Sequence, residues 1–150
     1  MSREIRKIYV DTNVIINYCT GIIDDVEALN YIFKTKRKEL LFTSSLAIVQ
    51  AIANLQTRKK TRKAFSKSET IEKLNRVLNK FTILNLTIDD IYEGFKSDSE
   101  DIEDGTHYAL SQKKKCNTIL TNNVSDFSNF TSVVKISPRL GLGQIKSLVN

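Results

Sequence analysis

Short apolar runs alternate with longer stretches of helical periodicity along this chain of 150 residues. The short runs are rich in Ile, Leu, Val and aromatic side chains, which predicts buried strands. These predicted strands cover Lys7–Val10, Leu40–Phe42, Thr82–Leu86, Thr118–Leu120 and Val133–Ile136. Between them, apolar residues spaced three and four apart predict helices. The predicted helices cover 14–16, 26–33, 46–55, 71–81, 88–95 and 101–115, and a loop with a short helix follows Pro138.

Short polar side chains precede several of these helices, where they suit N-caps that accept from free backbone N–H groups. The predicted caps are Asp24 and Asp25, Ser44 or Ser45, Ser66 or Ser68, and Thr87. Strands that alternate with helices predict an α/β fold with a mainly parallel sheet covered on both faces. Because no repeat, linker or composition change interrupts the pattern, we expect one domain over residues 1–150.

Composition narrows the class of protein. Hydrophobic residues make up 41% of the chain, and it has only one Pro and five Gly. The longest apolar runs are too short to cross a bilayer, so no membrane partner is expected. The start, MSREIRKIYV, is charged at once and lacks the apolar segment of a secretory signal. We therefore expect a cytoplasmic protein.

The cysteine and histidine content disfavours disulfide bonds, a zinc site and a two-histidine mechanism. Cys19 and Cys116 do not form a disulfide framework or a CxxC pair, so we expect two partly buried free thiols. His107 is the single histidine, which disfavours a zinc site. It also disfavours the two-histidine acid–base mechanism of metal-free ribonucleases.

The net charge of +6 is unevenly spread. Residues 89–104 contain eight acids and one base, Lys96, so this segment carries −7 and the rest of the chain +13. The bases gather at 34–38, 58–63 and 113–115. Basic surfaces around an acidic cluster suit a protein whose bases hold a polyanion and whose acids hold cations. Ordinary solvated surfaces would give the same charge pattern.

Acidic and amide side chains follow or precede strands at the same predicted edge of the sheet. Asp11 follows the first strand, and Asn122, Asn123 and Asp126 follow the strand at 118–120. Asp101, Glu103 and Asp104 open the helix that leads into that strand. Asp101 and Asp104 lie three residues apart and share a helix face with Tyr108, whereas Ile102, Ala109 and Leu110 are expected to face the core. Functional groups of parallel α/β sheets gather at the carboxyl ends of strands, so these acids should converge.

Close carboxylates repel one another, and a divalent cation removes that penalty. Mg²⁺ and Mn²⁺ prefer oxygen ligands and retain waters and phosphate contacts. Such a cation lowers the pKa of water and stabilises charge on a phosphate under attack. The residues together thus favour a Mg²⁺- or Mn²⁺-dependent reaction at a phosphate. Taken singly, Asp11 could be a helix cap and Asp104 an acid of a first helical turn.

Four blocks of sequence resemble the PIN domain family, and within it the branch of VapC-type toxin ribonucleases. The blocks are IYVDTNVIINY, SSLAIVQAIANL, DIEDGTHYAL and TILTNNVSDF, in the family's order and spacing over residues 7–136. The resemblance implies a three-layer α/β/α sandwich and Mg²⁺ or Mn²⁺ dependence. It also implies endonucleolytic cleavage of RNA, with an antitoxin protein and a homodimer as expected partners.

The resemblance also implies roles for individual residues. The catalytic set is Asp11, Asp104 and Asp126, and the metal ligands are these three with Asp101 and Asn123. The resemblance also aligns Gln50 and Glu103 with acidic positions of the family, as supporting residues. Thr12, Asn13 and Thr121 are expected to support the site because ligand carboxylates need hydrogen-bonded partners. The basic segment Arg58, Lys59, Lys60, Arg62 and Lys63 is a candidate for contact with the RNA backbone, although a solvated helix end would have the same composition.

Two positions depart from the family pattern. Gln50 stands where many PIN nucleases have Glu, and Asn123 stands where many have a fourth acid. Neutral side chains at both positions leave open a second reading, a non-catalytic PIN-like module that binds RNA or protein through a degenerate metal site. A phosphate-accepting receiver domain is disfavoured, because Thr12 and Asn13 follow Asp11 where that class needs an acidic pair.

The remaining expectations concern surfaces. His107 is expected on the helix surface and not as a ligand. Tyr18 and Tyr108 could stack on a base, although packing at the rim is the plainer expectation. Apolar residues at helical spacing between 26 and 55 form either a dimer face or part of the core.

Overall fold

The computed structural model describes residues 6–149. Residues 1–5 and Asn150 lie outside this range. The expectation of a missing secretory signal depends partly on residues 1–5. All five strands that the sequence predicts are present in one sheet. They are β1 (Ile8–Val10), β2 (Leu41–Ser44), β3 (Thr82–Leu84), β4 (Thr118–Leu120) and β5 (Val134–Ile136). Every neighbouring pair is parallel and the order is β3-β2-β1-β4-β5, so β1 lies at the centre.

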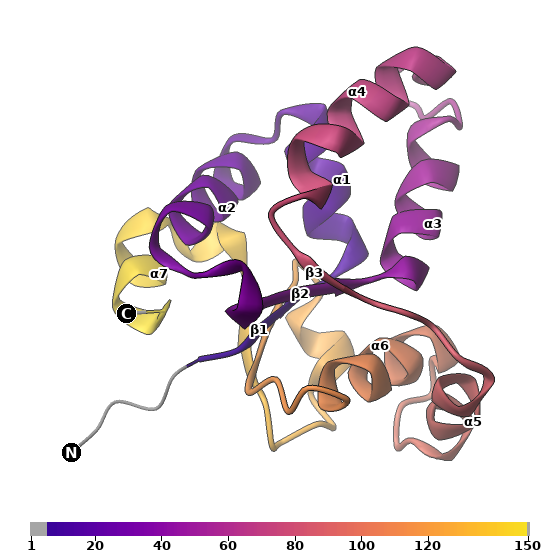
Figure 1. Ribbon diagram of the computed structural model, residues 1–150, viewed down its shortest axis with the longest axis vertical. Coiled ribbons are helices and arrows are strands. Elements are labelled where there is room, and N and C mark those ends of the chain that lie inside the picture. The colour runs from indigo at the N-terminus through magenta and orange to yellow at the C-terminus, as the bar shows by residue number, and fades with distance from the viewer. Residues whose placement is uncertain (1–5, 150) are drawn as a thin grey trace.

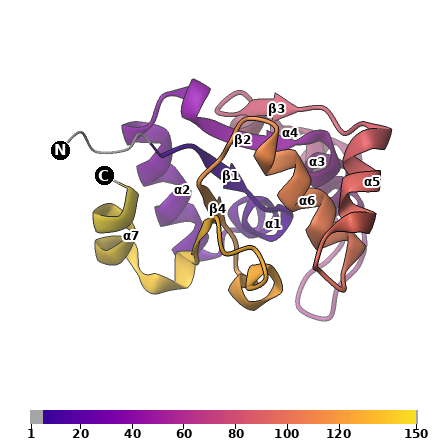
Figure 2. The ribbon, with the colours of Figure 1, turned by 90° about the horizontal axis from the view of Figure 1, so that it is seen from below.

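Seven α-helices within the described residues surround the sheet. They are α1 (Thr12–Thr20), α2 (Ile23–Thr35), α3 (Ser45–Leu55), α4 (Lys67–Leu78), α5 (Ile88–Lys96), α6 (Ile102–Gln112) and α7 (Leu142–Val149). The same described residues also form three short 3₁₀ helices: η1 (Lys38–Leu40), η2 (Val124–Phe127) and η3 (Pro138–Leu140). Figure 1 shows α1–α4 on one side of the sheet and α5 and α6 on the other, and in Figure 2 α7 lies beside α2, at the far end from α5. The predicted three-layer α/β/α architecture is confirmed.

Alternation along β1 divides the core into two layers. Ile8 and Val10 pack with α1–α4 and α7, whereas Tyr9 packs on the opposite face with α6 and Phe127. All three side chains are fully buried. A strand buried on both faces is the expected consequence of a parallel sheet between two helical layers.

The apolar residues between 26 and 55 belong mostly to this core. Ala28, Leu29 and Ile32 of α2 are fully buried, and so are Ala51 and Leu55 of α3. Val49 is an exception, with 63% of its surface exposed. The residues that suggested a dimer face from the sequence are therefore largely occupied by packing within the chain.

The helix caps are confirmed at three places and wrong at one. Ser44, Ser66 and Thr87 each accept a backbone N–H at the start of a helix, and Ser66 and Thr87 form capping boxes. Asp24 and Asp25 do not cap α2, whose N-cap is Ile22. Asp25 lies in the first turn of α2 and is buried, where its carboxylate is bound by side chains described below.

Close packing of α5 on α6 fixes the acidic segment between them. A side chain at Gly105 would collide with Ser97, and one at Gly94 would collide with Thr106. Glycine at both places allows the two helix backbones to approach one another. Residues 97–101 therefore form a tight connection that delivers Asp101 to the start of α6.

Candidate active site

Asp11 occupies the junction between β1 and α1, at the centre of the carboxyl edge of the sheet. Its Oδ1 accepts the Thr12 backbone N–H at 2.8 Å, so Asp11 is the N-cap of α1. Its Oδ2 accepts from the Asn13 side-chain amide at 3.0 Å and from the Thr121 hydroxyl at 2.7 Å. Only 5% of Asp11 is exposed. These three donors fix the direction of a buried carboxylate at the edge where the sequence placed it.

A second group of polar side chains supports Asn13 from behind. Both the backbone N–H and the side-chain amide of Asn122 donate to Asn13 Oδ1, at 3.0 and 3.2 Å. The Asn122 amide also donates to the buried Asp25 carboxylate at 2.8 Å, and Asn17 donates to the same oxygen. Burial raises the pKa of Asp25. Asn13 therefore keeps its amide nitrogen turned toward Asp11, because its oxygen is held by Asn122.

The acidic segment opens α6 beside this edge. Asp101 is the N-cap, with Oδ1 accepting the Asp104 backbone N–H at 3.1 Å. Burial raises the pKa of Asp104 to about 7, and the neighbouring carboxylates of Asp101, Asp126, Asp11 and Glu103 add to the rise. Asp104 is thus the point at which acids from β1, α6 and η2 affect one another. The sequence predicts that Asp11, Asp101, Asp104 and Asp126 form one site, and each of the other three carboxylates acts electrostatically on Asp104.

Asn123 and Asp126 come from the short turn after β4. The backbone N–H of Asn123 donates to Thr121 Oγ1, and the backbone N–H of Asp126 donates to the Asn123 carbonyl. Both side chains are exposed. The turn brings the Asp126 charge within electrostatic reach of Asp104.

The donors at this edge are carboxylate and amide oxygens, which suit Mg²⁺ and Mn²⁺. Within residues 6–149, no three Asp, Glu, His or Cys side chains are close enough together to form a ready metal-binding group. A protein commonly binds Mg²⁺ through one or two carboxylates while water fills the other positions. Asp11 Oδ1, whose one hydrogen bond in the described part of the chain is from Thr12, and the mutually repelling acids fit such a hydrated ion.

His107 lies inside the protein, and the prediction of a surface histidine is wrong. It is 3% exposed on the face of α6 that packs against β1. Its Nδ1 is 2.7 Å from the Tyr9 hydroxyl and its Nε2 is 2.8 Å from Gln50 Oε1. Burial lowers the pKa of His107. The expected inward face of α6 was also wrong at Ile102, which is 52% exposed.

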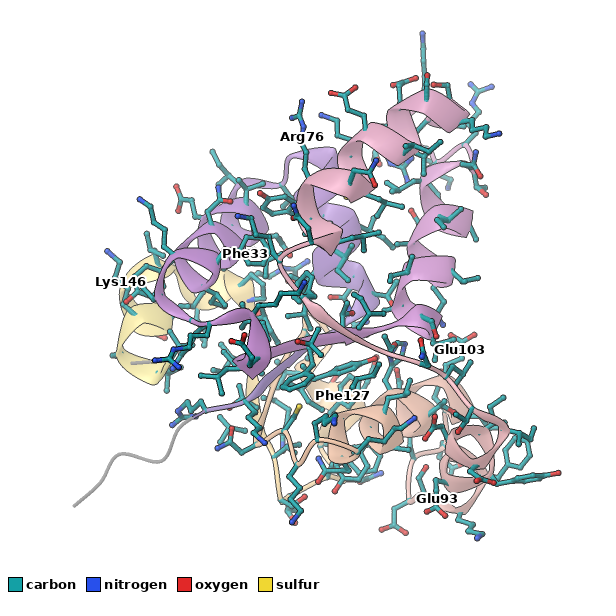
Figure 3. The ribbon with its side chains drawn as sticks, in the orientation of Figure 1. Phe33, Arg76, Glu93, Glu103, Phe127 and Lys146 are labelled. Carbon is teal, nitrogen blue, oxygen red and sulfur yellow. The ribbon has the colours of Figure 1, made fainter. Side chains whose placement is uncertain are left out.

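Gln50 connects α3 to this site. Gln50 Oε1 accepts from Thr12 Oγ1 at 2.7 Å and lies 2.8 Å from His107 Nε2. Gln50 Nε2 donates to Glu103 Oε2 at 3.0 Å. Figure 3 shows Glu103 near the N-terminal end of α3. The position that differs from the family pattern is therefore hydrogen-bonded at both ends of its amide.

The basic segment forms the loop between α3 and α4. Arg62 is turned inward: its guanidinium donates to the carbonyls of Leu55 and Asn54 and lies over the Phe65 ring. The other four predicted RNA-contact residues are exposed, namely Arg58, Lys59, Lys60 and Lys63. Arg62 thus shapes the loop, and its neighbours provide the free positive charge.

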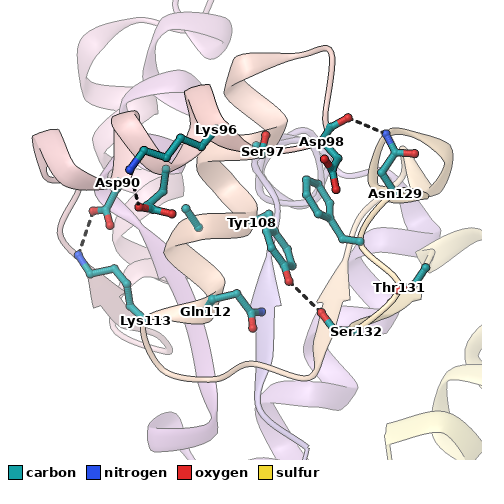
Figure 4. Close-up of a pocket in the computed structure, with 14 residues that line it drawn as sticks. Asp90, Lys96, Ser97, Asp98, Tyr108, Gln112, Lys113, Asn129, Thr131 and Ser132 are labelled. Carbon is teal, nitrogen blue, oxygen red and sulfur yellow. Dashed lines mark hydrogen bonds and ion pairs between the residues drawn. The ribbon is translucent and has the colours of Figure 1, made fainter.

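A cavity of about 540 Å³ lies between α5, α6 and residues 129–132 (Figure 4), and its lining does not include Asp11 or Asp104. Tyr108 stacks on Phe130 there, with ring centroids 3.9 Å apart, and its hydroxyl pairs with Ser132. Tyr18 packs edge-on against Phe33. Both tyrosines are engaged in packing at the rim. The two cysteines are free thiols, as expected, and both are buried and not only partly so.

Comparison with known proteins gives structural matches only. Neither a protein-family model nor a curated protein matches the sequence. A toxin–antitoxin complex from Klebsiella pneumoniae matches with a TM-score of 0.64 and 17% identity, over 87% of this chain and 97% of the other. VapBC2 from Rickettsia felis, bound to a promoter DNA fragment, matches with a TM-score of 0.64 and 16% identity, over 87% and 98%.

A third match is the Mycobacterium tuberculosis toxin VapC20, described as cleaving the sarcin–ricin loop. Its TM-score is 0.56 at 14% identity, over 75% of this chain and 86% of that one. The chain has a VapC-like PIN fold. In this fold Asp11 directly follows the central strand β1, and Asp101 and Asp104 lie at the start of α6. Within residues 6–149, no helix has the length and apolar character needed to cross a membrane.

Proposed function

We propose that this PIN-fold protein is a Mg²⁺- or Mn²⁺-dependent endoribonuclease and the toxin of a toxin–antitoxin pair. The observation that carries the proposal is Asp104, whose pKa is raised to about 7 by burial and by four other carboxylates. Structural ion pairs normally place a base beside such an acid, yet in residues 6–149 no base forms an ion pair with Asp104. Strongly perturbed acids of this kind are typical of functional sites.

The chain's own residues would orient the reaction. Asp11, held by Thr12, Asn13 and Thr121, provides a fixed carboxylate at the end of β1. Asp104 and Asp126 provide further negative charge that binds a cation. When bound, the cation would supply Lewis acidity, lowering the pKa of a water and stabilising charge on the phosphate. Asp101 and Asn123 are the remaining candidate ligands.

RNA contact is assigned to the exposed bases of the α3–α4 loop. Arg58, Lys59, Lys60 and Lys63 can pair with backbone phosphates, which gives affinity and salt dependence without sequence choice. The VapC20 toxin cleaves the sarcin–ricin loop, so a structured RNA is a reasonable first substrate.

Cleavage of a labelled RNA by the purified protein tests the proposal. We expect cleavage with Mg²⁺ or Mn²⁺, none in EDTA, and none with Asp104→Asn. Glu100→Gln is the matched control, because Glu100 is an exposed acid of the same segment and is not among the groups that raise the pKa of Asp104. Cleavage by Asp104→Asn at the wild-type rate would refute the assignment.

A non-catalytic RNA- or protein-binding module is the second candidate. Gln50 favours it, because a neutral amide already bound to Thr12, His107 and Glu103 has little capacity left for a metal. This candidate predicts RNA binding that persists in EDTA, without cleavage at any metal concentration.

An antitoxin protein is the proposed partner, because the similar structures include toxin–antitoxin complexes from Klebsiella and Rickettsia. Co-expression with the neighbouring reading frame and co-purification would test it. Formation of a homodimer stays a prediction, which light scattering after size-exclusion chromatography would test. The apolar residues of α2 that first suggested it lie in the core.

A further inference from the structure

A continuous chain of hydrogen bonds runs from the middle of the sheet to the edge of the candidate active site. Tyr9 Oη lies 2.7 Å from both Ser44 Oγ and His107 Nδ1. His107 Nε2 lies 2.8 Å from Gln50 Oε1, and Gln50 Nε2 lies 3.0 Å from Glu103 Oε2. Every group before Glu103 is held by neighbours on two sides, so the chain has little freedom to rearrange.

The direction in which each hydrogen bond of this chain is donated follows from the residue at its end, Glu103. The Glu103 carboxylate accepts from Gln50, so Gln50 turns its NH₂ toward Glu103 and its oxygen toward His107. An amide oxygen also only accepts, so His107 must carry its proton on Nε2. A neutral imidazole then accepts at Nδ1, and the Tyr9 hydroxyl must donate there. The Ser44 hydroxyl remains to donate to Tyr9.

The opposite arrangement of Gln50 is disfavoured at Glu103. With the amide reversed, Gln50 Oε1 would face the Glu103 carboxylate, and two acceptors would repel one another. Thr12 reinforces the observed arrangement, because its hydroxyl donates to the same Gln50 oxygen at 2.7 Å. That oxygen has two lone pairs, and Thr12 and His107 occupy both.

We propose that Gln50 is a positioning residue, which the buried Tyr9–His107 pair orients so that its amide holds the Glu103 carboxylate at the active-site edge. Gln50 is neutral, and the Glu103 carboxylate that it holds supplies the negative charge at this edge of the site. This carboxylate is one of those that act on Asp104. The expected consequence, an effect on cation binding, rests on the proposed function. The hydrogen-bond chain itself does not depend on that function.

NMR of the protein without metal or RNA tests the chain directly. We expect His107 to be neutral at pH 7 with its proton on Nε2, and one Gln50 side-chain proton to be shifted downfield and protected from exchange. Glu103→Ala should return that proton to the position of a free amide, whereas Glu100→Ala should leave it unchanged. A proton on His107 Nδ1, or an unmoved Gln50 resonance in Glu103→Ala, would overturn the proposal.

Calorimetric titration with Mn²⁺ tests the consequence through a double-mutant cycle. Gln50→Ala and Glu103→Ala should each weaken binding roughly fivefold to tenfold, and the double variant no more than either one, because Gln50 acts through Glu103. Effects that multiply would show independent roles and refute the positioning role. If wild-type protein binds no Mn²⁺, the proposed function fails, and the NMR result still decides the hydrogen-bond chain. Thermal melts of each variant confirm that the fold is retained.

Discussion

Replacing Asp104 with Asn should stabilise the folded protein in the absence of divalent cations while abolishing cleavage. In residues 6–149 nothing donates a hydrogen bond to the Asp104 carboxylate, whose pKa is raised to about 7 by burial and by Asp101, Asp126, Asp11 and Glu103. At pH 8 this carboxylate is ionised among other anions, and its charge opposes folding. An amide of the same shape removes the charge and adds no bulk.

The size of the effect follows from the shift in pKa. A change from 3.8 to about 7 corresponds to about 4 kcal/mol if the whole shift is counted at about 1.4 kcal/mol per pH unit. Because Asp104 is only partly buried, solvent screens much of this interaction, and we expect a net gain of about 1–2 kcal/mol at pH 8. This exceeds the change of about 0.5 kcal/mol that is usual for a surface substitution.

The sign of the pH dependence is fixed by linkage. As pH falls through 7, the folded wild type takes a proton at Asp104, while the unfolded chain stays ionised until pH approaches about 3.8. The wild type is therefore relieved of its penalty on acidification. The advantage of Asp104→Asn should be full at pH 8, smaller at pH 5.5, and nearly gone close to pH 4.

Urea denaturation in EDTA at pH 8 and pH 5.5 measures this difference, with Glu100→Gln as the matched control. Addition of Mg²⁺ at pH 8 should stabilise the wild type more than Asp104→Asn, because ligand binding to the folded state adds to its stability. The reasoning is refuted if the variant is less stable than wild type at pH 8, or if its advantage is the same at both pH values.

The remaining predictions concern the basic loop and two residues that hydrogen-bond to buried carboxylates. Alanine at both Lys59 and Lys60 should weaken RNA binding for every sequence and reduce the salt slope by about 1–2, measured by fluorescence anisotropy; an unchanged slope would exclude this loop. Asn122→Ala should lower the free energy of unfolding by about 1–3 kcal/mol, because it leaves buried Asp25 with one donor fewer, and urea titration would contradict this if the midpoint did not move. Thr121→Val should lower kcat by roughly tenfold, because the Thr121 hydroxyl donates to the Asp11 carboxylate. Thr121→Ser keeps that hydroxyl and should cleave at the wild-type rate; equal rates in the two variants would exclude this role.

The sequence was sufficient for the fold because parallel α/β sheets leave a strong pattern. Each strand is a short apolar run, and the three central strands, β1, β2 and β4, are buried on both faces, so the periodicity of the flanking helices was not needed to place them. The edge occupied by Asp11 and Asp104 followed from topology, since carboxyl ends of parallel strands share one edge. Capping at α2 was less predictable, because Asp25 serves a tertiary contact with Asn122 in place of the helix terminus.

The position of His107 could not be read from the period of α6. The buried face of that helix is polar and small, with Gly105, Thr106 and Ser111 beside Leu110, whereas Ile102 is exposed. Hydrophobic periodicity correctly places Leu110 inward but also places Ile102 there and gives no reason to bury His107. The missed signal lay elsewhere in the chain, at Tyr9.

Tyr9 stands in the middle of a strand that is apolar on both sides, and a buried tyrosine hydroxyl needs a partner. Helix α6 covers that face of the strand, so a polar residue on its inner face is one candidate partner, beside Ser44 of β2. His107 fulfils this requirement at 2.7 Å, and in doing so it directs its other nitrogen at Gln50. Glutamine at position 50 is thus matched to a neutral histidine: a carboxylate there would accept from His107 Nε2 but could not donate to Glu103. The neutral residue that looked like the loss of a ligand is therefore better understood as one member of a linked set, in which changing position 50 alone would break the bond to Glu103.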